Sequence, residues 1–154
     1  MVFKKMYLTV TLYSFILNSC CMTKTLVAGI ASAVVFFLLG WLFYGILLMD
    51  YFTANSVQYA GLMKEPPELW AIAIGNLCWG LAIAYILSKS GVTAAAKGFA
   101  VGFIVFLLMS AGFDFVMYGT ENLYSAKIIG IDALINAVMG GISGAVAALI
   151  LGRK

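Results

Sequence analysis

Long apolar segments alternate with short polar connections along this chain. A helix needs about 20 mainly apolar residues to cross a hydrocarbon core that is about 30 Å thick. Segments of that length run over residues 26–49, 69–87, 95–117 and 128–151. Pro66 and Pro67 precede the second segment, where the missing N–H of proline costs a helix little. The pattern therefore predicts an all-α integral membrane protein, a bundle of four transmembrane helices.

Composition agrees with this interpretation. The chain is 64% hydrophobic and 10% charged, with a mean hydropathy of +1.08. Soluble domains average about 45–50% apolar residues and about 25% charged residues. Few residues lie outside the four apolar segments, so residues 22–154 are expected to form one transmembrane domain without a separate soluble domain.

Charged residues are sorted between the two ends of the predicted helices. The six acidic residues lie toward one end: Asp50, Glu65, Glu68, Asp114, Glu121 and Asp132. Most of the nine basic residues lie toward the other end: Lys4, Lys5, Lys24, Lys89, Lys97, Arg153 and Lys154. Lys and Arg in short loops stay on the cytoplasmic side of a membrane. Both termini are therefore expected inside, and residues 50–68 outside, where they form a lid or partner-docking segment or a plain amphipathic connector.

The first 21 residues allow three interpretations. A basic start, an apolar run and the sequence Leu17-Asn18-Ser19-Cys20 are typical of a lipoprotein signal. The stretch can instead be an over-extended start, with translation beginning at Met22, or a short fifth membrane segment. A lipoprotein signal and a fifth segment would each invert the charge sorting, which favours Met22. The mature N-terminus stays open between Met1, Met22 and an acylated Cys20.

Ionisable residues inside the apolar segments are the candidate functional groups. Asp114 and Asp132 each fall near the outer end of a predicted helix, where an unpaired charge costs several kcal/mol. Because the two helices are adjacent and antiparallel, we expect both carboxylates at a similar depth. The sequence predicts a polar pocket that opens outward, with Asp132 at its base and Asp114 at its wall. Its candidate residues are Asp132, Asp114, Asn136, Asn76, Tyr44 and Asp50.

A purely structural role for both carboxylates stays open as an alternative. In that case Asp114 reaches the headgroup region, and Asp132 bonds a neighbour such as Asn76 across a helix interface.

Small residues at four-residue spacing predict where the helices pack. Helices in lipid associate through close backbone approach, which Gly and Ala permit. The expected packing residues are Gly98, Gly102, Ala137, Gly140, Gly141, Gly144 and Ala145. The last helix carries two adjacent rows of such residues, so one row can face its own bundle while the other faces a second subunit. A homo-oligomer or membership of a larger membrane complex is therefore expected alongside purely internal packing.

Two short motifs carry a family resemblance over about residues 26–151. The sequences Gly40-Trp41-Leu42-Phe43-Tyr44 and Ile131-Asp132-Ala133 resemble those of small four-helix bacterial membrane proteins, catalogued as domain of unknown function 1761. Asn136 stands here where that family is expected to have His. The resemblance implies four transmembrane helices in the bacterial cytoplasmic membrane, and it draws attention to Tyr44 and Asp132. It implies no activity.

Several function classes are not indicated by any motif. The chain has no His, no phosphate-binding glycine loop and no nucleophile beside a base, and its three Cys show no zinc spacing. No enzyme activity, metal, cofactor or nucleic acid is therefore expected, and the bilayer is the expected surrounding partner. The sequence favours a non-catalytic subunit or assembly protein. The alternative is a small proton-coupled transporter or channel that uses Asp132 and Asp114.

Overall fold

The described part of the chain is helical throughout. The computed structural model describes residues 2–59 and 61–153, with side chains from residue 22 onward. Its elements are α1 (Val2–Leu42), the π-helical turn η1 (Phe43–Leu47), α2 (Met49–Asn55), α3 (Leu69–Lys89), α4 (Ala95–Thr120) and α5 (Ala126–Leu151). No β-strand occurs among these residues. The all-α prediction is confirmed.

Four helices are long and apolar enough to cross a membrane. They cover Met22–Leu47, Leu69–Lys89, Ala95–Thr120 and Ala126–Leu151. The last three agree with the predicted segments to within about one turn. The first differs, because its α-helix extends upstream to Val2 and changes to a π-helical turn after Leu42. The alternatives for residues 1–21 stay open, because their side chains lie outside the described part of the structure.

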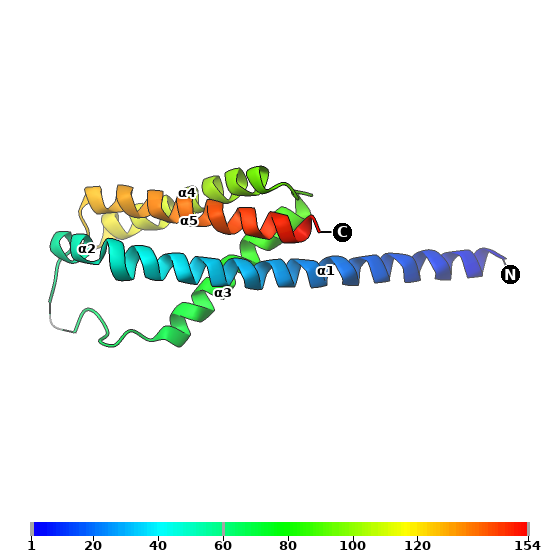
Figure 1. Cartoon of the computed structure of the whole chain (residues 1–154), viewed down its shortest axis with the longest axis horizontal. Helices are drawn as coiled ribbons and strands as arrows, with labels where there is room; N and C mark the ends of the chain where they lie inside the picture. The colour runs from blue at the N-terminus through cyan, green and yellow to red at the C-terminus, as the bar shows by residue number, and fades with distance from the viewer. Residues whose placement is uncertain (1, 60, 154) are drawn as a thin grey trace.

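The helix α5 contacts each of the other three long helices. It packs against α1, α3 and α4, whereas α4 packs mainly on α5. The helix α3 crosses α1 obliquely and ends near the C-terminus (Figure 1). At that end the Lys24 ammonium donates a hydrogen bond of 2.8 Å to the Arg153 carbonyl. Among the described helices, α5 has the most buried residues.

Glycines bring α4 and α5 into backbone contact. Gly98 and Gly102 of α4 lie against Gly144 and Gly140 of α5. A Cβ atom at Gly98 would stand 2.5 Å from the Gly144 carbonyl oxygen, closer than such atoms approach. Gly141 faces the ring of Phe99, also on α4. The glycines of both small-residue rows on α5 therefore have neighbours within the same chain.

A second close crossing joins α1 to α3. A Cβ atom at Gly80 would lie 2.5 Å from the Ala33 nitrogen and closer still to the Gly29 carbonyl oxygen. Gly29 and Ala33 have the same small-residue spacing as the glycines of α4. The sequence analysis did not single out this pair, although its spacing was visible.

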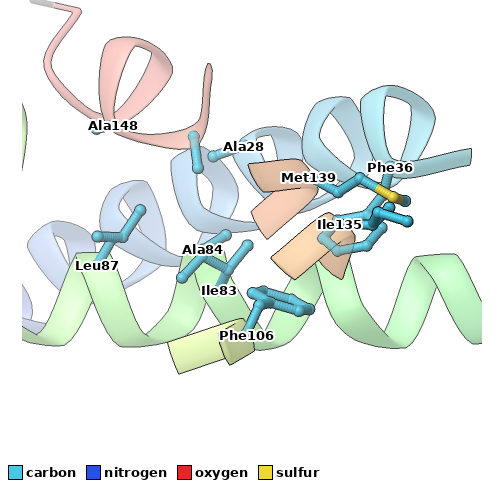
Figure 2. Close-up of a cluster of buried hydrophobic side chains, with 10 residues drawn as sticks. Ala28, Phe36, Ile83, Ala84, Leu87, Phe106, Ile135, Met139 and Ala148 are labelled. Carbon is cyan, nitrogen blue, oxygen red and sulfur yellow. The ribbon is translucent and has the colours of Figure 1, made fainter. Parts of the chain in front are cut away.

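Apolar side chains from α1, α3, α4 and α5 fill the space between the two crossings (Figure 2). The rings of Phe36 and Phe106 meet at 4.6 Å between centroids, and Ile83 and Leu87 are fully buried. Many large apolar side chains on the outer surface are exposed instead, such as Leu108 at 67%. So much exposed apolar surface would cause a soluble monomer to aggregate, but it suits contact with lipid.

A glycine ends α3 and turns the chain toward α4. Gly91 has a φ of +65°, which favours glycine over other residues. The Val92 N–H donates to the Leu87 carbonyl at 3.0 Å, the six-residue bond of a Schellman cap. Val92 then packs against the buried cluster. The short connection keeps the start of α4 close to the end of α3.

The glycine contact leads to a matched pair of expected outcomes. Gly102→Ala places a Cβ atom against the Gly140 carbonyl and should destabilise the protein by about 1–3 kcal/mol, as overpacking does. Gly112→Ala, on the same helix with nothing within 4 Å, should be neutral or stabilise by up to about 1 kcal/mol. SDS-induced unfolding in mixed micelles measures the stability of both variants. Equal effects would contradict the close α4–α5 contact.

Candidate functional site

Tyr44 lies in the π-helical turn that interrupts the first membrane-length helix. The Leu48 N–H donates to the Phe43 carbonyl at 2.8 Å, a bond across five residues. Such turns inside α-helices frequently occur at functional sites. The Tyr44 ring packs edge-on against Phe52 of α2 at 5.4 Å between centroids. Its hydroxyl donates a 2.7 Å hydrogen bond to Asp132 Oδ1 on α5.

Five polar side chains from three elements form one hydrogen-bonded group, here named the polar cluster: Tyr44, Ser110, Asp114, Asp132 and Asn136. The Asn136 amide nitrogen lies 2.8 Å from Asp132 Oδ2 and 3.0 Å from the Tyr44 hydroxyl. Asp132 therefore receives donors at both carboxylate oxygens. The members are half-buried and lie at one end of the α4–α5 contact.

Ser110 lies between the two carboxylates. Its hydroxyl oxygen is 3.0 Å from Asp114 Oδ2 and 3.2 Å from Asp132 Oδ2. A serine hydroxyl carries one proton, so it can donate to only one carboxylate at a time. The second contact becomes a hydrogen bond only when a carboxyl group carries a proton and donates to the serine oxygen. The geometry thus accommodates one extra proton shared over the pair.

No cation balances these carboxylates among the described side chains. The salt bridge found there joins Lys64 to Glu68, outside the polar cluster. Lys127 is close to Asp132 in sequence, but its ammonium lies 5.9 Å from the centre of the Tyr51 ring. Within the same residues, no three His, Cys, Asp or Glu side chains converge as a metal site would require. The polar cluster therefore offers a ligand two carboxylates without a resident cation.

A hollow of about 1200 Å³ adjoins the polar cluster. Tyr44, Asp114 and Asp132 reach its wall, and apolar side chains such as Phe113 and Met117 line much of the rest. The connection between α2 and α3 forms one side of it, including Tyr59. The hollow is large enough for a small organic molecule, since ligand pockets usually measure about 300–1,000 Å³.

One short backbone contact fastens the α2–α3 connection beside the hollow. The Val57 N–H donates to the Leu123 carbonyl at 3.0 Å, and Ser56 pairs with Tyr124 in an isolated antiparallel bridge. This contact links the connection to the loop between α4 and α5. The connection thus forms one wall of the hollow, and the short helix α2 precedes it in the chain.

The structure brings together four of the six predicted pocket residues: Tyr44, Asp114, Asp132 and Asn136. Asp50 does not join them, because it lies exposed in the first turn of α2. Asn76 is also separate, and its amide donates to the Ile72 carbonyl of its own helix at 2.8 Å. The oblique course of α3 explains the separate position of Asn76, because the first half of α3 has no buried residue and diverges from α4 (Figure 1).

Ser110 is the cluster member that sequence reasoning missed. A serine in an apolar helix does not by itself indicate a polar site, because its hydroxyl can hydrogen-bond to the backbone of its own helix. Its position one turn before Asp114 was the available clue, since residues four apart share a helix face.

Comparisons of the chain with protein-family models, curated proteins and solved structures find no match. The site is therefore interpreted from its own geometry, and the resemblance to domain of unknown function 1761 stays a proposal.

The hydrogen bond from Tyr44 to Asp132 should stabilise the fold. Tyr44→Phe removes the donor and should lower the free energy of unfolding by about 1.5–3 kcal/mol, the range for a hydrogen bond to a charged group. Tyr118→Phe is the matched control, because that side chain is 48% exposed and lies outside the polar cluster. SDS-induced unfolding compares the two. A loss no larger in Tyr44→Phe than in the control would count against this bond.

Proposed function

We propose that this is a multi-pass membrane protein whose polar cluster binds a small cationic solute in exchange for a proton. The observation that carries the proposal is the pair Asp114 and Asp132 on one serine hydroxyl, with no cation beside them in the described residues. This function corresponds to the transporter alternative of the sequence analysis.

The physical argument rests on charge in an apolar surrounding. A carboxylate within a membrane-spanning segment costs several kcal/mol unless it is paired, hydrated or neutralised. A shared proton neutralises one charge of the pair, and a cation in the adjoining hollow would neutralise it equally well. The positive charges of the proton and of the cation repel each other at the pair, so binding of the cation should favour release of the proton. This exchange is the basic requirement of proton-coupled transport.

The proposal includes an orientation in the bacterial cytoplasmic membrane. Lys89 ends α3, Lys97 begins α4 and Arg153 follows α5, so these basic residues lie at one end of the bundle. The polar cluster and the hollow lie toward the other end. The preference of basic residues for the cytoplasmic side supports a cytoplasmic C-terminus and a hollow that opens outward. Under this orientation a solute would enter from outside the cell.

Cation-dependent stabilisation tests the exchange. Methylammonium, guanidinium, Na⁺ and K⁺ are added to the detergent-solubilised protein at pH 6 and pH 8, and its melting temperature is measured. A cation that binds the folded protein should stabilise it by about 2.7 kcal/mol when the free cation concentration is 100 times its Kd. Release of one proton makes the apparent affinity rise with pH, by at most about tenfold per unit. The effect should therefore be larger at pH 8.

Two carboxylate variants act as the matched pair for this test. Asp132→Asn should remove both the stabilisation and its pH dependence, because Asp132 holds the centre of the polar cluster. Asp50→Asn should preserve both, because Asp50 is exposed on α2 outside the cluster. Stabilisation by none of the four cations, or an unchanged response in Asp132→Asn, would sink the proposal.

A non-catalytic subunit is the second candidate function, and one surface favours it. Ala71 and Gly75 form a small-residue row on the exposed first half of α3, and a Cβ atom at Gly75 would meet nothing within 4 Å. Such rows bring helices together in membranes. Since none of the described side chains covers Gly75, a partner helix would come from a second copy of the chain or from another protein.

Gly75→Leu tests this second candidate. If a partner helix lies there, the variant should lose at least about half of any protein that co-purifies stoichiometrically in mild detergent. Gly112→Leu, which also has open space around it, should retain the partner. Native mass spectrometry counts the subunits. An unchanged partner content in Gly75→Leu would remove the support that this surface gives.

A further inference from the structure

Aromatic side chains surround the hollow beside the polar cluster. They come from α1, η1, α2, α4 and the two connections that meet at the Ser56–Tyr124 bridge. The six are Trp41, Tyr44, Phe52, Tyr59, Phe113 and Tyr124. Several are exposed rather than packed away, with Trp41 at 64% and Phe113 at 66%. Aromatic faces attract cations, most strongly when the cation carries little bound water.

The charged side chains that line the hollow also favour a cation. Asp114, Asp132 and Glu65 are acidic, and Lys64 is basic. Lys64 is already ion-paired with Glu68, so its charge is largely balanced outside the hollow. The described lining is therefore negative, and two of its three carboxylates, those of Asp114 and Asp132, belong to the polar cluster.

The size of the hollow selects among cations. Its volume of about 1200 Å³ greatly exceeds the space that a bare alkali ion fills, since a water molecule takes about 30 Å³. An ion alone would leave the aromatic wall without a contact. A ligand with a charged head and an apolar body would place its head at the carboxylates and its body against the rings.

We propose that the hollow binds an organic ammonium ion with an apolar body, held between the carboxylates of the polar cluster and the aromatic side chains that line the hollow. This inference rests on the proposed cation-for-proton exchange and adds the ligand class to it. The ammonium group can belong to a free amine or to the headgroup of a phospholipid at the outer membrane surface. Both sources present the same chemistry to the site.

The test uses the full chain in nanodiscs of phosphatidylglycerol, a lipid without an ammonium group, with binding measured by calorimetry. Benzyltrimethylammonium is the main probe. Benzyl alcohol carries the ring without the charge, and Na⁺ carries the charge without the ring. Benzyltrimethylammonium should bind at least about tenfold more tightly than either, because it engages both the carboxylates and the rings.

Two phenylalanines on α4 give a matched pair. Phe113 lines the hollow and Phe115 does not, although both are exposed to nearly the same extent, 66% and 65%. Phe113→Leu should weaken binding of benzyltrimethylammonium by about fivefold, the size of one cation–π contact. Phe115→Leu should leave it within about twofold of the unaltered protein. Both side chains are exposed, so the fold should tolerate either change.

Different failures have different meanings. If Na⁺ binds as tightly as benzyltrimethylammonium and Phe113→Leu has no effect, the ligand class is wrong while the cation-for-proton exchange stands. If no probe binds and Asp132→Asn leaves melting unchanged, both proposals fall. Nanodiscs that also contain phosphatidylethanolamine separate the sources. Weaker probe binding there supports a headgroup ligand, and unchanged binding supports a free amine.

Discussion

The backbone contact between α4 and α5 is the constraint on which the site depends. Gly98 faces Gly144 and Gly102 faces Gly140, so each four-residue step along α4 is matched by a four-residue step back along α5. Two further steps place Ser110 opposite Asp132, where the hydrogen bond between them is found. The glycines therefore set both the distance between the helices and their register. A shift by one residue would rotate Ser110 away from the carboxylate that it contacts.

The same molecule combines a tightly packed end with an open end. Small residues join α4 to α5 and α1 to α3 at the end that holds Gly98 and Gly29. Beyond these contacts, larger side chains such as Phe106 fill the space between the helices, and α3 diverges obliquely (Figure 1). The hollow lies where the helices are no longer held together by backbone contact. The packed end can therefore position the polar cluster without closing it.

Sequence alone could predict the helices and most of the polar cluster, but not how the helices face one another. Hydropathy gives the depth of a residue in a membrane, and Asp114 and Asp132 were predicted at a similar depth on neighbouring helices. Depth does not give direction around the helix axis, so Asn76 was grouped with them although α3 diverges. Ser110 required the interhelical register, which depends on the glycine contact and cannot be obtained from one helix alone.

The distribution of hydrogen bonds assigns different roles to the two carboxylates. Asp132 accepts from Tyr44, Ser110 and Asn136, which together occupy both of its oxygens and fix its orientation. Asp114 shares Ser110 through one oxygen, and it also lines the hollow. A cation that enters the hollow would therefore pair more readily with Asp114, whose second oxygen has room for a new partner. Asp132 would then keep its own negative charge in place through its three donors, because Ser110 is free to donate to it once the cation pairs with Asp114 and the proton that the two carboxylates shared is released.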